Sequence, residues 1–123
     1  MKILIDTHIF LWATSNRKML SKEKMDALQN PYNQIYVSAI NVTEIIIKVG
    51  IGKLTANFDP VIMAKQSGFN LLDYRAEDAL SLQTLPLHHK DPFDRMLIAQ
   101  AKANDMVIMT NDALFKLYDC ELI

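Results

Sequence analysis

The sequence predicts an α/β fold in which a parallel sheet carries helices on both faces. Short apolar runs rich in Ile, Val and Leu alternate along the chain with longer segments whose apolar residues recur at helical spacing. Strands that alternate with helices indicate a parallel sheet, because two parallel strands need a crossover connection long enough to hold a helix. The 123 residues contain no internal repeat and no dividing linker, so we expect one domain over residues 1–123.

Four strands are predicted, and a fifth, short strand is expected at the end of the chain. Each is a brief run of apolar or β-branched residues that stops at a polar residue or a turn. The central sheet is therefore expected to have four to five strands. In chain order these strands cover residues 2–5, 34–38, 69–72, 106–109 and 121–123.

The helices are predicted from their end signals as well as from their apolar spacing. Asp59-Pro60 and Asp91-Pro92 each combine a capping acid with a proline suited to the first helical position, and Gly68 ends a helix. The segment that follows the second strand is apolar over most of its circumference, so we expect it to be substantially buried. In chain order, helices are expected after Asp6 and over residues 21–30, 38–49, 59–67, 76–84 and 92–104, with a helical turn that runs through Tyr118.

Composition and charge exclude several classes of protein. A chain with 50% hydrophobic and 22% charged residues is neither disordered nor a coiled coil. No apolar run reaches the ~20 residues of a membrane span, and no signal peptide is evident. We therefore expect no membrane association. Cys120 is the only cysteine, so no intramolecular disulfide can form and a reducing cytoplasm is the expected compartment. With a net charge of −1, nucleic acid could be bound only through a local basic rim or metal ions.

Four acidic residues are expected to meet at one edge of the sheet. Asp6 and Asp112 follow the first and fourth strands. Glu44 lies in the helix after the second strand, and Asp94 lies in the first turn of the helix before the fourth strand. If the first and fourth strands are neighbours, these side chains converge at the carboxyl ends of the strands, where open α/β sheets bind ligands. Two carboxylates ~5 Å apart repel by ~3 kcal/mol at an effective dielectric near 20, so the cluster must take up protons, recruit cations or be spread apart. Oxygen ligands without cysteine or paired histidine favour Mg²⁺ or Mn²⁺.

Several of these acids also have simpler structural interpretations. Asp6 could only cap the helix that follows it. Asp91 has a sufficient role as an N-cap, and Asp94 could only complete a capping box with it. Glu44 and Lys48 could form an ordinary surface pair at i,i+4, or line a wet cleft.

Other polar residues near the acids are candidates for contacts with a substrate. Thr110 could hold Asp112 or a metal-bound water, or cap the following turn. His88 and His89 could contact substrate, although a loop histidine pair is usually exposed. Trp12, Phe93 and Met96 are expected in the core. The candidates for a local basic rim are Lys48, His88, His89, Lys90 and Arg95.

Four segments of the sequence together resemble the PIN-domain family, and within it the VapC-type toxins of bacterial type II toxin–antitoxin pairs. The most specific piece is Asp-Pro-Phe-Asp-Arg with the Ile-Ala-Gln-Ala that follows it. One departure is Asn41, where a serine is expected in this subgroup. The segments are Asp6-Thr7-His8, Ser38…Glu44…Lys48 with Gly52-Lys53-Leu54, His88-His89-Lys90-Asp91-Pro92-Phe93-Asp94-Arg95, and Thr110-Asn111-Asp112.

The resemblance implies a three-layer α/β/α sandwich around a parallel sheet and an endoribonuclease activity that depends on Mg²⁺ or Mn²⁺. It also implies an RNA substrate, a homodimer, and a small cognate antitoxin that occupies the active-site groove. Asp91 belongs to the motif of the subgroup, but its place as a metal ligand is less secure. The residues implied to be both catalytic and metal-binding are Asp6, Glu44, Asp94 and Asp112.

Two other functions fit parts of the sequence. A receiver-like phosphoacceptor domain also places acids at strand ends around Mg²⁺, and Asp73 after the third strand could be its nucleophile. That class needs adjacent acids early in the chain, however, and Asp6 has no acidic neighbour. A non-catalytic PIN-like interaction protein could use the same acids to bind a basic partner.

Overall fold

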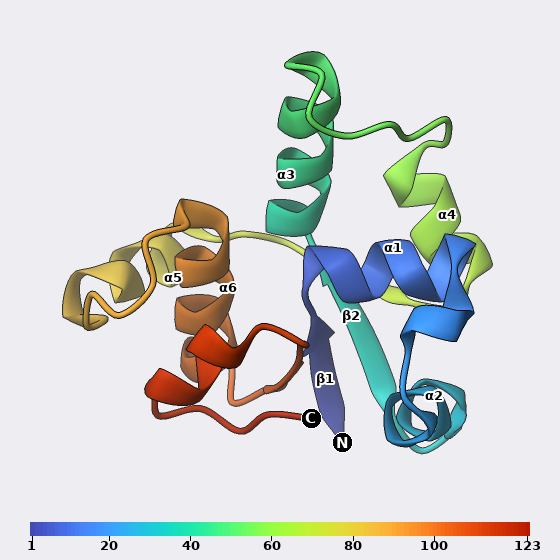
Figure 1. Cartoon of the computed structure of the whole chain (residues 1–123). Coiled ribbons are helices and arrows are strands. Elements are labelled where there is room, and N and C mark those ends of the chain that lie inside the picture. The colour runs from blue at the N-terminus through green and yellow to red at the C-terminus, as the bar shows by residue number, and fades with distance from the viewer.

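A computed structural model describes all residues, 1–123, and shows a parallel four-stranded sheet with helices on both faces (Figure 1). The strand order is β3-β2-β1-β4, so the first and fourth strands are neighbours. The predicted α/β/α fold class is therefore confirmed. The expected strand over 121–123 is only an isolated bridge between Leu122 and Ile108. The strands are β1 (Lys2–Ile5), β2 (Gln34–Ser38), β3 (Asn70–Leu72) and β4 (Val107–Met109).

The helices begin and end close to the predicted residues. The helix expected over 76–84 divides into a short α-helix and a 3-10 turn, Ser81–Thr84, and a further 3-10 turn forms at Arg17–Met19. The helical turn expected through Tyr118 is the 3-10 helix Ala113–Leu117, which ends one residue before it. None of the helices has the length and apolar character needed to cross a bilayer. The α-helices are α1 (Thr7–Ser15), α2 (Lys22–Gln29), α3 (Ala39–Gly50), α4 (Pro60–Gln66), α5 (Ala76–Leu80) and α6 (Pro92–Ala103).

The sheet separates two apolar cores. Successive side chains of a strand point to opposite faces, so Ile3 and Ile5 of β1 pack under α1, α2 and α4, while Leu4 packs under α6. Both faces of the central strand are fully buried, which explains its uninterrupted apolar sequence.

The outer half of α3 is exposed, which corrects the expectation of a largely buried helix. Ile46 is 57% exposed and Ile47 45%, whereas Ile40 and Ile45 are buried. Figure 1 shows the reason: α3 begins where β2 ends and projects away from the sheet. The apolar circumference of this helix therefore reflects an exposed apolar surface as well as core packing.

A buried polar network joins α5, α6 and the end of β2. The carboxylate of Asp78 accepts hydrogen bonds from Arg75 (3.2 Å), Gln100 (3.1 Å) and Asn104 (3.0 Å). Gln100 in turn accepts a 2.6 Å bond from the hydroxyl of Ser38, the residue that caps α3. Burial by itself would raise the pKa of Asp78, but the hydrogen bonds outweigh it and hold the pKa at about 2.

This network predicts acid-sensitive stability. Since the pKa of Asp78 is lower in the folded chain than in the unfolded one, its contribution is complete above pH ~4 and is lost as the pH falls toward 2. Urea unfolding should show that Asp78→Asn lowers the free energy of unfolding at pH 7 by about 2 kcal/mol and flattens the loss of stability between pH 5 and 2. Asp26→Asn, which removes an exposed acid paired with Lys22, is the control. An acid slope equal to that of the wild type in Asp78→Asn would contradict the prediction.

Candidate metal centre

The strand order brings the ends of β1 and β4 together at one edge of the sheet. The backbone N–H of Asp6 donates to the carbonyl of Met109 (3.1 Å), so the residues that leave these two strands are held side by side. The hydroxyl of Thr110 then donates to Asp6 Oδ2 (2.5 Å) and accepts from the N–H of Asp112 (2.9 Å). One threonine therefore links two of the four expected acids, and the sequence interpretation anticipated its contact with Asp112 but not the one with Asp6.

Glu44 reaches the same edge from the second turn of α3. Its side chain is buried, and its two oxygens accept from the Thr7 hydroxyl (2.6 Å) and from Lys48 Nζ (2.5 Å). Asn41 completes the capping box of α3 and donates to the Thr7 hydroxyl (3.1 Å). The Glu44–Lys48 pair is therefore not an ordinary surface pair, because the carboxylate lies inside the protein.

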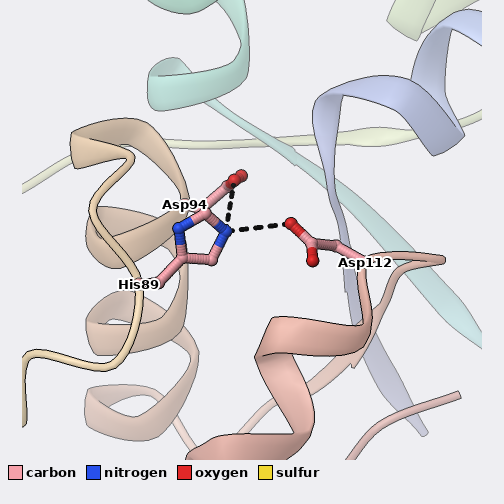
Figure 2. Close-up of side chains that lie close together, drawn as sticks. All are labelled: His89, Asp94 and Asp112. Atoms are coloured by element: carbon pink, nitrogen blue, oxygen red, sulfur yellow. Dashed lines mark hydrogen bonds and ion pairs between the residues drawn. The ribbon is translucent and has the colours of Figure 1, made fainter.

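Asp94, Asp112 and His89 form the closest cluster (Figure 2). The Nε2 atom of His89 lies 3.0 Å from Asp94 Oδ2 and 2.9 Å from Asp112 Oδ2. One ligand atom from each of these residues lies within 4.8 Å of the others, which is the spacing of a metal-binding group. Asp6 and Glu44 are not part of this closest group.

His89 is buried, with 7% of its surface exposed, whereas a loop histidine was expected to be exposed. The Tyr118 hydroxyl accepts the backbone N–H groups of both His88 and His89, which fixes the loop before α6. The ring of His89 then packs edge-on against Phe115. His88 does remain exposed.

The hydrogen bonds of His89 also assign its tautomer. The backbone N–H of Asp91 donates to Nδ1 (3.1 Å), so Nδ1 is an acceptor and the ring proton lies on Nε2. That proton points between Asp94 and Asp112. In this arrangement His89 donates a hydrogen bond to the acids and does not offer a lone pair to a metal. The only sequence signal for this hydrogen-bonding role of His89 is its position two residues before Asp91, the N-cap of α6, whose backbone N–H fixes the ring.

The pocket carries more negative charge than its protein partners neutralise. Burial, and then the negative charge of Asp91, raises the pKa of Asp94 to about 7, and Glu44 and Asp6 contribute further. Burial also raises the pKa of Asp6. Burial would raise the pKa of Asp112 too, but hydrogen bonds, led by that from His89, lower it.

These carboxylates fit a hard divalent cation. Asp94 Oδ1 has no hydrogen-bond partner in the protein and is free to bind one, and the surrounding donor atoms are carboxylate oxygens, the ligands that Mg²⁺ and Mn²⁺ prefer. Asp91 has the capping role that the sequence favoured, because its Oδ1 accepts from the N–H groups of Phe93 (2.8 Å) and Asp94 (3.2 Å). It acts on the site through its charge.

The expected basic rim is smaller than the sequence suggested. Arg95 turns away from the acids and donates to the carbonyl of Pro86 (2.9 Å), which ties down the preceding loop. Lys48 is committed to Glu44. His88 and Lys90 are the exposed members of the rim.

Fold and site together define a class: a three-layer α/β/α protein with clustered carboxylates at the carboxyl edge of a parallel sheet. The chain belongs to the PIN domain family, whose family model matches residues 3–119. This confirms the family that the sequence segments resemble. No curated protein sequence matches the chain.

Solved structures share this fold at low sequence identity. VapBC2 from Rickettsia felis, bound to a DNA fragment from its promoter, is 18% identical with a TM-score of 0.76, and the match covers 100% of this chain and 98% of that chain. VapBC-1 from nontypeable Haemophilus influenzae is 18% identical with a TM-score of 0.68, covering 100% and 97%. The PIN domain endonuclease Utp24 is 16% identical with a TM-score of 0.51, covering 94% and 74%. At these identities the matches show a shared fold.

Proposed function

We propose that the chain is an endoribonuclease that depends on Mg²⁺ or Mn²⁺ and serves as the toxin of a toxin–antitoxin pair. The observation that carries the proposal is the acidic cluster, in which burial and then the neighbouring carboxylates raise the pKa of Asp94 to about 7. A divalent cation bound there would neutralise this repulsion. Membership of the PIN domain family supports a nuclease, and the proposed catalytic and metal-binding residues are Asp6, Glu44, Asp94 and Asp112.

Each proposed ligand is held by neighbours that fix its direction. Thr110 orients Asp6, and His89 orients Asp94 and Asp112 together. A bound divalent ion would activate water and neutralise charge on the phosphodiester oxygens. The protein side chains therefore serve to place that ion and the phosphate with their geometry set in advance.

The proposed partners are a small antitoxin and a second copy of the chain. VapBC complexes share its fold, and the outer half of α3 exposes apolar side chains of the kind that protein interfaces cover. We further propose one domain over residues 1–123, acting on RNA in the cytoplasm. A receiver-like function has no support from the position of Asp73, its candidate nucleophile. Asp73 is exposed after the edge strand β3, and its charge is not among the main causes that raise the pKa of Asp94, as a neighbour in the same site would be.

The proposal is tested by adding purified protein to total bacterial RNA with Mg²⁺, with Mn²⁺, or with EDTA, and mapping the new RNA ends. Calorimetry without RNA measures cation binding separately. We expect cleavage with either ion and none with EDTA. Cleavage that persists in EDTA, or a protein that neither binds these ions nor cuts RNA, would overturn the proposal.

The hydrogen bond from His89 predicts an effect on metal affinity. His89→Phe keeps the packing against Phe115 but removes the N–H that holds Asp94 and Asp112, and losing such a partner typically lowers metal affinity about 10- to 100-fold. His89→Gln can still direct an amide N–H at both acids and should recover most of that affinity. Mn²⁺ titration followed by electron paramagnetic resonance measures both.

His88→Ala is the matched control, because His88 is exposed and contacts neither acid in the described structure. It should bind Mn²⁺ as the wild type does. Equal affinities in His89→Phe and the wild type would show that Asp94 and Asp112 need no support from this ring.

A further inference from the structure

A cavity of about 300 Å³ opens directly beside the acids. Two of its lining residues, Asp6 and Asp112, are proposed metal ligands. The other three are His8 and Trp12 of α1 and Asn111, which lies between Thr110 and Asp112. A group that enters this cavity therefore lies next to any cation held by the carboxylates.

One wall of the cavity is aromatic. His8 and Trp12 lie one helical turn apart on α1, with ring centroids 5.7 Å apart and planes tilted by 38°. Trp12 was expected in the core, and part of it does pack against the core under α1, but its ring also lines the cavity. His8 and Asn111 are exposed.

The polar atoms of these three lining residues are free to bind a ligand. The indole N–H of Trp12, the ring nitrogens of His8 and the side-chain amide of Asn111 have no hydrogen-bond partner in the described structure, residues 1–123, and none of them is a buried unsatisfied group. They face solvent as donors and acceptors on an aromatic surface. Flat heteroaromatic rings with polar edges match that combination.

The charges of the lining decide which part of a nucleic acid fits. Asp6 and Asp112 repel a phosphate unless a cation neutralises them, so an anionic group belongs at the metal and a neutral group in the cavity. The neutral, planar parts of RNA are its bases, which single-stranded RNA presents unstacked.

We propose that this cavity is a nucleobase subsite, in which a base next to the scissile phosphate stacks on Trp12 and His8 and hydrogen-bonds with Asn111. The proposal rests on the proposed ribonuclease function and deepens it, because it assigns side chains to a base beside the cut. Stacking of one base on an aromatic side chain is worth ~1–3 kcal/mol, which corresponds to ~5- to 150-fold in affinity.

Trp12 is the only tryptophan of the chain, so its fluorescence reports on the subsite without any cleavage. With Mg²⁺ present, adenosine and uridine monophosphates are titrated against ribose 5-phosphate, which lacks a base. We expect the nucleotides to quench Trp12 in a saturable way and ribose 5-phosphate not to do so. His8→Ala should weaken the nucleotide binding at least fivefold, and Tyr32→Ala, which removes an exposed ring in the turn before β2, away from the acids, is the control. Equal responses to the nucleotides and to ribose 5-phosphate would overturn the subsite.

A cleavage experiment separates the subsite from the nuclease function. Single-stranded RNA oligonucleotides carry one abasic nucleotide, moved along the sequence one position at a time. We expect one position beside the cut where the abasic change raises KM in the wild type and has little further effect in His8→Ala or Trp12→Leu. If RNA is cut but no position shows this pattern, the subsite is wrong while the nuclease stands. If bases quench Trp12 but no RNA is cut, the subsite stands while the nuclease function fails.

Discussion

Replacing Asp94 by Asn should abolish tight binding of Mg²⁺ or Mn²⁺ and lower RNA cleavage by about 100-fold or more, with no loss of stability. The amide has nearly the shape of the carboxyl and can still accept the hydrogen bond from His89. It cannot supply the negative charge that a cation needs. Cleavage rates and calorimetric Mn²⁺ titrations measure the two losses.

The effect of Asp94→Asn on stability follows from the raised pKa of Asp94. A carboxyl whose pKa is higher in the folded chain than in the unfolded one opposes folding increasingly as the pH rises through the folded value, here about 7. Without metal at pH 8, the Asn variant should therefore melt at the same temperature as the wild type or above it. A lower melting temperature together with lost cleavage would indicate a general structural defect instead.

Two further Asp→Asn variants serve as comparisons. Asp105 lies in the turn before β4, at the opposite edge of the sheet, and its φ of 54° is one that asparagine tolerates well. Asp105→Asn should leave metal affinity and cleavage unchanged. Asp91→Asn keeps a good N-cap for α6 while removing a charge near Asp94, so it should change cleavage far less than Asp94→Asn does. Full activity in Asp94→Asn would place the site elsewhere.

The sequence predicted the parts of the fold that depend on local chemistry. Asp59 and Asp91 cap the helices that their following prolines suggested, because capping involves only the next two or three residues. The position of the acids was predictable only on the condition that β1 and β4 are neighbours. The strand order fulfils that condition, and neighbouring strands of a parallel sheet bring their carboxyl ends together.

Contacts between distant parts of the chain were not predictable. His89 is buried because Tyr118, 29 residues later, binds its backbone, and nothing near His89 in the sequence indicates that partner. Arg95 turns to the carbonyl of Pro86 in the loop before α6, and nothing in its own helix indicates that partner. The exposure of Ile46 and Ile47 depends on where the sheet ends, which an apolar helical pattern does not record.

Replacing Phe10 by Ala should lower the free energy of unfolding by about 3–5 kcal/mol, the largest loss of stability we expect from one substitution. Phe10 is fully buried on α1, and its ring meets Phe58 (6.5 Å, 74°) and Phe69 (6.3 Å, 60°) edge-on. The smaller side chain leaves a cavity and removes both aromatic contacts. Urea unfolding measures the loss, and the melting temperature should fall by about 10–20 °C.

The comparison of Phe10→Ala with Phe10→Leu separates packing from the acidic site. Leucine fills most of the cavity, so its cost should be below about 1.5 kcal/mol. Phe10 lies in the core under α1, whereas His89 packs against Phe115 in the core on the other face of the sheet. Well below its melting temperature, Phe10→Ala should therefore bind Mn²⁺ as tightly as the wild type, the reverse of what Asp94→Asn does. If both Phe10 variants lost metal affinity in proportion to their stability, the acids would depend on the packing of α1 as a whole, and the contacts of Thr110 and His89 would not be enough to hold them.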